Sequence, residues 1–386
     1  MRFHVVSVPF THTTDDFSSC AFTEKTRKFC MMMHSLGHEV YLYAGQKNEA
    51  PCTEHIYIVN EQERLDFLGQ KHYTQGNYDF ALPFWRKFNA GVAKEIGKRK
   101  QPKDFICIIS GRANQSIEEA HPELMTVEFG IGYQGSYAKY RVFESYAWMH
   151  ATYAQQAGNH DTNGFFYHDV IPSYFETHRF DLKVNKGEHL LFVGRLTERK
   201  GIMIAEQLAK ETGRPLHVAG TGDLPPPADC VYHGVVGWRE RNRIMGEARA
   251  LICPTIYLEP FGSVAVEAQL CGTPAITTDW GAFPETVEHG VSGYRCRTMQ
   301  EFVDAVDICH TLSPYAIRQR AVRKYSLEAV ARMYDRYFHR LATLWGDGFY
   351  EKGWTKLCTS TMKTDPLEAT SATVTPLAMH RRSGTT

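Results

Sequence analysis

The sequence predicts an α/β protein with two tandem Rossmann-like domains that face each other across a cleft, and three observations indicate this. With 386 residues, the chain is too long for one ordinary core. Short apolar runs alternate with segments of helical periodicity, which is typical of parallel sheets flanked by helices. An irregular stretch from Ile171 to Gly187 separates two such series. Two parallel sheets in tandem would leave a ligand-binding crevice between the carboxyl ends of their strands.

The first series belongs to a predicted domain of residues 1–178. Its expected strands are Phe3–Val8, Glu39–Tyr43, Phe105–Ile109 and Met125–Phe129. Residues from Phe22 to Leu36 have helical spacing, and Gly37 suits the C-cap of that helix.

The second series belongs to a predicted domain of residues 179–325. Its expected strands are Leu190–Val193, Leu216–Ala219, Ala250–Cys253 and Ala275–Thr278. Its expected helices are Ile202–Thr212, Arg239–Glu247 and Ser263–Cys271.

An amphipathic helix is expected after Ser326, within a predicted segment of residues 326–350. Its apolar residues recur at three- and four-residue steps: Leu327, Val330, Ala331, Tyr334, Phe338 and Leu341. From Thr359 onward the chain is rich in Ser and Thr and poor in large apolar residues. Residues 351–386 are therefore predicted to be a largely disordered tail.

The composition favours a globular protein without a strong charge preference. The formal net charge is zero, whereas proteins that grip nucleic-acid backbones usually carry a basic excess. No apolar run is long enough to span a bilayer, and the N-terminus reads as a first strand rather than a signal peptide. The ten cysteines show no metal-binding spacing. We expect a cytoplasmic protein, with peripheral membrane association left open.

The segment from Ile252 to Glu267 combines features that suit a phosphate and a sugar. A buried strand ends, a loop carries Glu259, and a helix opens at Gly262. The first N–H groups of a helix bind phosphate without a side chain, and glycine lets a ligand approach the backbone. Glu267 lies about one turn into this helix, and two carboxylates can accept hydrogen bonds from a ribose and a hexose. Taken alone, two glutamates at this spacing are more often solvated surface acids, but the preceding strand, the Pro-Phe-Gly run and the helix start favour a ligand site.

A second candidate turn follows the strand that ends at Gly194. Arg195 and Lys200 flank the turn into the next helix, where two cations could neutralise a leaving diphosphate. The alternative is a basic helix entry with no ligand. Arg199, between them, is expected to be exposed.

Together these runs resemble the family 4 retaining glycosyltransferases of the GT-B fold, over roughly residues 171–344. The matching motifs are the G-R-L-x-x-x-K-G turn, Gly220-Thr-Gly222-Asp, Tyr232-His-Gly234, the E-x7-E helix, Gly272-Thr-Pro274, Gly281-Ala-Phe-Pro-Glu285 and Gly290-Val-Ser-Gly293. The resemblance implies that Glu259, Arg195 and Lys200 are catalytic, with Glu259 on the donor sugar and the two cations on the diphosphate. It implies that Glu267 contacts the ribose and that the last long helix crosses back onto the first domain. The other donor-binding residues that it implies are Gly194, Phe261, Gly262, Ser263, Val264, His233 and Val236, of which the segment from His233 to Val236 would line the nucleobase pocket.

The first half departs from this family. The usual glycine pair after the first strand falls on Cys20 and Ala21, and the family's histidine in a later strand has no clear match. Glu128 is the nearby candidate for an acceptor-side residue, together with Tyr133; the alternative for Glu128 is a buried structural role. An aromatic-rich stretch could form an acceptor platform or belong to the core of a helix: Tyr133, Tyr137, Tyr140, Phe143, Tyr146 and Trp148.

The chain contains no D-x-D motif, the usual metal grip of the other large transferase fold. The resemblance implies retention of anomeric configuration, no required metal, no tightly bound cofactor and a nucleotide-diphosphate hexose as donor, a UDP-sugar rather than a GDP-sugar. The acceptor stays open among a saccharide, a lipid-linked sugar, a small metabolite, a protein and a modified nucleic-acid base. Two alternatives are an epimerase or hydrolase acting on nucleotide sugars and a non-catalytic nucleotide-sugar binding module. A nicotinamide dehydrogenase is disfavoured because Gly220-Thr-Gly222 lacks the third glycine of that motif.

Overall fold

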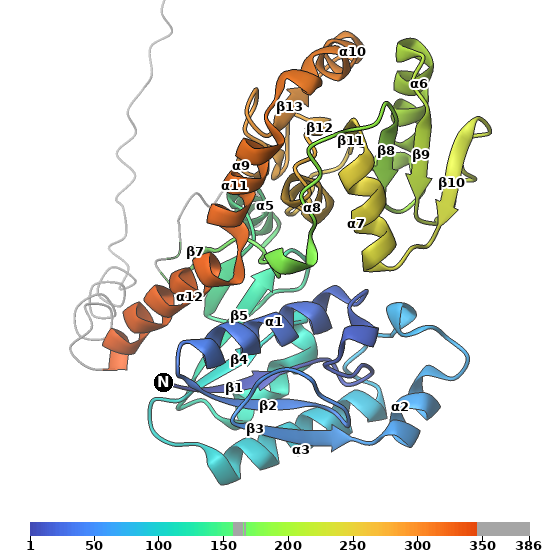
Figure 1. Ribbon diagram of the computed structural model, residues 1–386. Helices are drawn as coiled ribbons and strands as arrows, with labels where there is room; N and C mark the ends of the chain where they lie inside the picture. Colours follow the sequence, from blue (N-terminus) through green and yellow to red (C-terminus); the bar gives the residue numbers. More distant parts are fainter. Residues whose placement is uncertain (157–164, 166, 346–386) are drawn as a thin grey trace, which may run out of the picture. The chain divides into compact units, whose positions relative to one another are not determined.

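Two parallel sheets flanked by helices make up the computed structural model, which describes residues 1–156, 165 and 167–345 (Figure 1). The first sheet has seven strands in the order β3-β2-β1-β4-β5-β6-β7, and the second has six in the order β10-β9-β8-β11-β12-β13. Neighbouring strands in both sheets run parallel. The predicted fold class, two α/β units with parallel sheets, is confirmed.

The elements of the first half have the following bounds. The strands are β1 Arg2–Val6, β2 Glu39–Gly45, β3 Glu54–Val59, β4 Phe105–Ile108, β5 Met125–Ile131, β6 Tyr140–Phe143 and β7 Asp169–Val170. The helices are α1 Ala21–Ser35, α2 Glu61–Leu68, α3 Pro83–Arg99, α4 Gln115–Ala120 and α5 Tyr146–Gln156.

The elements of the second half continue the numbering. The strands are β8 Leu190–Val193, β9 Leu216–Ala219, β10 Cys230–Gly234, β11 Ala250–Cys253, β12 Ala275–Thr278 and β13 Gly293–Cys296. The helices are α6 Ile202–Thr212, α7 Trp238–Glu247, α8 Ser263–Leu270, α9 Phe283–Thr286, α10 Met299–Ile308, α11 Pro314–Tyr325 and α12 Leu327–Ala342.

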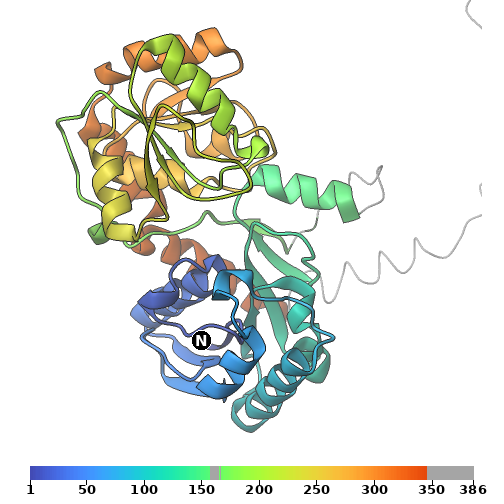
Figure 2. The same ribbon diagram turned by 90° about the vertical axis from the view of Figure 1, so that its right-hand side faces the viewer.

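The inner strands β8 and β11 of the second sheet are apolar on both faces because helices cover both faces of the sheet (Figure 2). Leu190 and Phe192 of β8 belong to the core that includes α6 and α10 residues. Leu191, between them, belongs to the core that includes α7, α8 and α11 residues. Alternate side chains of one strand therefore enter two different cores. This double burial produces the continuous apolar runs by which these strands were predicted.

Strand order creates a crevice in each sheet. In the first sheet the chain leaves β1 in one direction and returns on its other side at β4; in the second sheet β8 and β11 have the same relation. Loops that follow such strand pairs diverge, and α/β proteins bind ligands at this topological switch point. The turns after β8 and β11 are the two that carry the predicted catalytic residues.

Several predicted elements are confirmed, and others were missed. The four strands predicted for the second half have the observed bounds, as does the helix Ile202–Thr212. The edge strand β10 was missed because its side chains are mostly exposed or half-buried, so it lacks a continuous apolar run. The aromatic stretch from Tyr133 to Trp148 is not one helix, because β6 occupies its middle and α5 begins only at Tyr146.

The predicted irregular stretch from Ile171 to Gly187 links the two halves and is irregular in the structure. Its only regular features in the described residues are an isolated bridge between Phe175 and Ser326 and one 3-10 turn, Thr177–Arg179. In α12, the Phe338 ring packs against Phe3 of β1 and Phe29 of α1, with centroids 4.6 and 6.1 Å away. Residues Met1–His339 form one compact unit that contains both sheets. The domain boundaries stay predictions, and the predicted tail of residues 351–386 lies outside the described residues.

Candidate functional site

The turn after β8 packs directly against the turn after β11. Gly201, which precedes α6, has a φ of 80°, and a Cβ at this position would lie 2.1 Å from the carbonyl oxygen of Pro254. Only glycine fits such a close approach of two backbones. The contact holds Lys200, the residue before Gly201, beside the loop that carries Glu259.

Lys200 and Glu259 form the central ion pair of the candidate site. The Lys200 ammonium lies 2.7 Å from Glu259 Oε2, and the Tyr257 hydroxyl donates to the same oxygen over 2.9 Å. Glu259 is only 9% exposed. Burial opposes the charge on Lys200, but Glu259 and Tyr257 outweigh it and the pKa of Lys200 is raised. Lys200 is therefore a fixed cation at the switch point of the second sheet.

Helix α8 opens immediately after this pair. Gly262 is its N-cap, with a φ of 79°, and a Cβ there would come within 2.7 Å of the Phe283 ring. No side chain caps the helix, Ser263 is exposed and Val264 is half-buried. The first amides of α8 are thus free of side-chain acceptors, as an anion-binding helix end requires.

Phe261, one of the predicted donor-binding residues, has a buried side chain. It is 3% exposed and packs on Phe175 and Tyr325, with ring centroids 6.4 and 5.8 Å away. An aromatic side chain in this loop is more stable in the core than in a polar crevice. The side chain of Phe261 therefore anchors the loop to the core.

Glu267, one turn into α8, pairs with Arg241 of α7. The distance from Arg241 Nε to Glu267 Oε2 is 3.1 Å, but the alignment is poor. Both of these atoms are buried and have no hydrogen-bond partner within the described residues. They line a cavity of about 270 Å³ together with Val236 and the loop residues Ser18 and Ser19. The pair therefore retains hydrogen-bonding capacity that a ligand hydroxyl could use.

His233 of β10 belongs to a cluster of three histidines with His217 of β9 and His189, the residue before β8. The His189 and His217 rings are stacked with centroids 3.9 Å apart, and His233 Nε2 lies 3.2 Å from His217 Nδ1. Burial, followed by the charges of His189 and His233, lowers the pKa of His217 to about 4. Val236 lines the cavity beside Glu267, whereas His233 is held in this cluster.

Arg195 is the second predicted cation of the site. It follows Gly194, is exposed, and makes no ion pair with any residue of the described ranges. Arg199 is also exposed, as predicted, and its guanidinium lies over the Tyr257 ring at 4.4 Å from the centroid. Arg195 is therefore the cation of this turn that remains free for a ligand.

Glu128, the acceptor-side candidate of the first sheet, is fully buried. Its carboxylate accepts hydrogen bonds from the Tyr133 hydroxyl at 2.9 Å and from the backbone N–H groups of Tyr137 and Ala138 at 2.9 and 3.2 Å. Burial raises the pKa of Glu128 despite these bonds. The Tyr133 hydroxyl also accepts from the backbone N–H of Ser110. These contacts give both side chains a structural role, the alternative that the sequence left open for Glu128.

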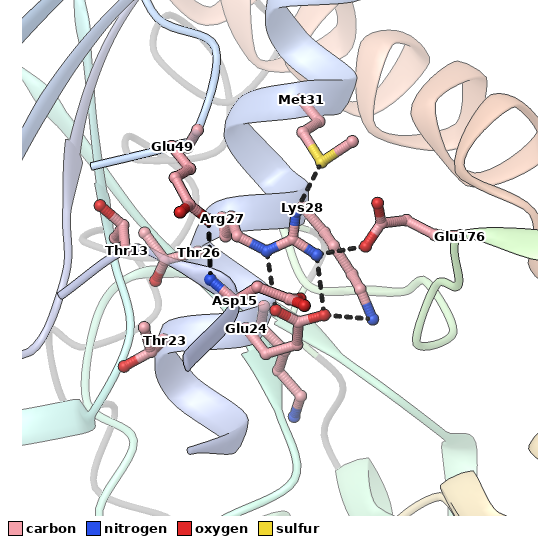
Figure 3. Close-up of polar contacts among 12 residues, drawn as sticks. Thr13, Asp15, Thr23, Glu24, Thr26, Arg27, Lys28, Met31, Glu49 and Glu176 are labelled. Carbon is pink, nitrogen blue, oxygen red and sulfur yellow. Dashed lines mark hydrogen bonds and ion pairs between the residues drawn. The ribbon is translucent and has the colours of Figure 1, made fainter. Parts of the chain in front are cut away.

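Helix α1, which follows β1, carries ion pairs that the sequence did not predict (Figure 3). Arg27 of α1 is buried, pairs with Glu24 at 2.8 Å and also contacts Glu176 of the linker. Lys28 pairs with Glu24 at 3.0 Å. The spacing of Glu24, Arg27 and Lys28 predicts contacts within the helix, but the partner 149 residues away cannot be read from it.

The described residues offer no assembled metal centre and no spanning helix. Across residues 1–156, 165 and 167–345, no three His, Cys, Asp or Glu side chains are grouped so that they could hold a metal ion. No helix in the same ranges is both long and apolar enough to cross a bilayer.

The fold, with two Rossmann-like sheets and a charged switch point, is the GT-B fold of glycosyltransferases. Over 88% of its length the chain superposes on sucrose-phosphate synthase from Thermosynechococcus elongatus, with a TM-score of 0.62, 16% identity and 99% of that chain covered. It superposes over 87% of its length on HepE of Anabaena in complex with UDP and glucose, with a TM-score of 0.60, 13% identity and 98% of that chain covered. At these identities the likeness concerns the fold alone.

Residues 187–311, about a third of the chain, match the family described as Glycosyl transferases group 1. Alpha-maltose-1-phosphate synthase of Mycobacterium tuberculosis is 28% identical over 174 residues, which cover 36% of this chain and 45% of that protein. The matched segments span less than half of the first curated relatives, 42% and 45% of their lengths. The similarity in sequence thus concentrates in the half that holds Lys200, Glu259 and Glu267.

Proposed function

We propose that this protein is a retaining, metal-independent glycosyltransferase that moves a hexose from a nucleotide-diphosphate sugar, a UDP-sugar in preference to a GDP-sugar, to an acceptor hydroxyl. The observation that carries the proposal is the Lys200–Glu259 pair at the start of α8, with Glu267 one turn further along the same helix. These groups provide the three kinds of contact that such a donor needs.

The diphosphate would lie between the turn after β8 and the N-terminus of α8. Lys200 is fixed there by Glu259, Arg195 is exposed and unpaired within the described ranges, and the first amides of α8 have no side-chain cap. Cations and a helix N-terminus stabilise the charge that develops on a departing diphosphate. Because these groups are positioned before the donor binds, little reorganisation accompanies the reaction.

The two carboxylates would divide the hydroxyl groups of the donor between them. Glu259 lies beside the proposed diphosphate position, and its carboxylate would accept hydrogen bonds from the hexose. Glu267 lines a separate cavity with Val236, and its Oε2 atom lacks a hydrogen-bond partner in the described residues, so it is offered to the ribose. The preference for uridine rests on the fold relative HepE, whose complex contains UDP and glucose.

In the proposed reaction, the bond between the anomeric carbon and the diphosphate breaks while the acceptor oxygen attacks the same face. A diphosphate oxygen then accepts the acceptor's proton, so no side chain has to act as the base. This assignment agrees with the state of the carboxylate nearest the diphosphate, because Glu259 is already engaged by Lys200 and Tyr257. The chain's own part is to hold the donor and to stabilise the leaving charge.

Turnover with defined donors tests the proposal. The protein is incubated with UDP- and GDP-hexoses and with a panel of saccharide, lipid-linked sugar and small-metabolite acceptors, and nucleotide release and glycosylated product are quantified. The proposal expects acceptor-dependent release from a UDP-hexose, an α-linked product from an α-linked donor, and unchanged rates in EDTA. Loss of all activity in EDTA with recovery in magnesium would refute metal independence, and an inverted product would refute retention. Epimerised or free sugar formed from the donor alone would favour the epimerase or hydrolase.

A further inference from the structure

A second cavity, separate from the proposed donor site, lies against α9 and α11. Its volume is about 660 Å³, and neither Lys200, Glu259 nor Glu267 lines it. Glu144, Tyr146 of α5 and Val170 of β7 line it from the first half, and residues of α9, β13 and α11 line it from the second half. A cavity of this size suits a small organic molecule.

The carboxylates that line this cavity are already engaged. Glu285 accepts from the backbone N–H groups of Tyr146 and Ala147 at 3.0 Å each, which caps the start of α5. Glu144 pairs with Lys25 at 2.8 Å and accepts from the Ser173 hydroxyl. Glu288 pairs with Arg320 at 2.7 Å. A ligand rich in hydroxyl groups would therefore have to compete for acceptors that are taken.

One cation on this wall is not engaged. Lys324 lies one helical turn after Arg320 on α11, so both point to the same side of the helix. Arg320 is buried and bonded to Glu288, whereas Lys324 is exposed and forms no ion pair with any described residue. Partial burial, followed by the charge of Arg320, lowers the pKa of Lys324. An anion beside Lys324 would relieve this repulsion.

The remaining lining is largely apolar. Its accessible apolar side chains include Val170 and Pro172, which are neighbours in the chain, and Met333 of α12, all of them half-buried. Burial of an alkyl chain against such side chains is favourable by the area that it removes from water. The wall thus pairs an apolar surface with one free ammonium group.

We propose that this cavity binds an organic anion that has an alkyl body and a single anionic head, with the head on Lys324 and the chain against the apolar wall. The unpaired ammonium group of Lys324 favours an anionic ligand. Because the carboxylates of the lining are already bonded, they are not available to accept from sugar hydroxyls, and the apolar wall favours an alkyl body. The proposal goes beyond the glycosyltransferase reaction and does not depend on it, because the two sites share no charged residue.

Decanoate is the probe, and calorimetric titration measures its binding to the full chain. Decanol, which lacks the charge, and acetate, which lacks the chain, are the matched probes. The expected result is saturable binding of decanoate that Lys324→Ala weakens at least about 10-fold, the loss typical of one charge-assisted contact, and that Lys324→Arg largely restores. Met333→Trp, which fills part of the cavity beside the apolar wall, should also weaken the binding of decanoate. Arg323→Ala is the matched control, because Arg323 is an exposed cation beside Lys324 that does not line the cavity.

Equal binding of decanoate by the wild type and Lys324→Ala would overturn the proposal, as would decanol binding as tightly as decanoate. Absence of decanoate binding to the wild type would overturn it too. Melting temperatures of Lys324→Ala, Lys324→Arg and Arg323→Ala should match the wild type, because Lys324 and Arg323 are both exposed. Donor binding should be unchanged in Lys324→Ala, so failure of this site and failure of the donor site give different results.

Discussion

The crevice of the second sheet and that of the first sheet have the same strand topology but opposite chemistry. After β8 and β11 the chain presents Lys200, paired with Glu259, and an unpaired Arg195 within the described residues. Beside β4, the Glu128 carboxylate is enclosed by Tyr133 and two backbone N–H groups. The same topology therefore supports either a ligand site or a closed internal network. The ligand site differs from the closed network in having a charged side chain, Arg195, that is exposed.

The largest expected effect of this difference is on stability. Glu128→Ala removes the acceptor of three buried donors and should lower the free energy of unfolding by about 3 kcal/mol. Urea titration followed by fluorescence measures this. Glu119→Ala is the control, because Glu119 is exposed on α4 and should change the value by no more than about 0.5 kcal/mol. Equal losses in both variants would show that the hydrogen bonds of Glu128 do not stabilise the first half.

The next effect is on catalysis and compares two neighbouring cations. Lys200→Ala should reduce kcat/KM on the order of 10-fold or more, because a charge-assisted contact to the diphosphate is lost. Arg199→Ala is the matched control: Arg199 lies over the same Tyr257 ring but is exposed and makes no contact with Glu259. Its kcat/KM should stay within about 2-fold of the wild type. Similar losses of kcat/KM in the two variants would show that Lys200 has no specific role and acts only as part of a basic surface.

Much of the second half could be predicted from the sequence, and the reason is physical. Its strands are buried on both faces, so they read as short apolar runs, and the turns after β8 and β11 carry motifs whose glycines fit only one backbone geometry. The edge strands β10 and β13 and the short strands β6 and β7 lack such runs and were missed. Strand β3 was also missed: its residues Ile56–Val59 are apolar, but only Ile56 and Val59 are buried. The contacts Arg27–Glu176 and Arg241–Glu267 join residues far apart in the chain, so no local pattern predicts them.

A smaller effect on stability is expected from the cluster of three histidines in the second half. The pKa of His217 is about 4 in the folded protein and 6.5 in the unfolded reference, so between these values the unfolded chain binds the additional proton. Stability should therefore fall as the pH drops from 6.5 to 4. His217→Phe keeps a ring in the cluster and should flatten the dependence of the melting temperature on pH. His34→Phe, at an exposed histidine of α1, is the control and should leave the slope unchanged. A wild-type melting temperature that is constant over this range would contradict the assignment.

Titration of a nucleotide sugar tests the proposed donor site most directly. UDP-hexoses and GDP-hexoses are titrated into the wild type, Glu267→Ala and Glu247→Ala. Glu247 is a suitable control because it pairs with Arg243 on α7, as Glu267 pairs with Arg241, but does not line the cavity beside α8. The account predicts saturable binding of a UDP-hexose to the wild type, at least about 10-fold weaker binding to Glu267→Ala, and unchanged binding to Glu247→Ala. Failure of every UDP- and GDP-hexose to bind, or equal affinities for the wild type and Glu267→Ala, would contradict it.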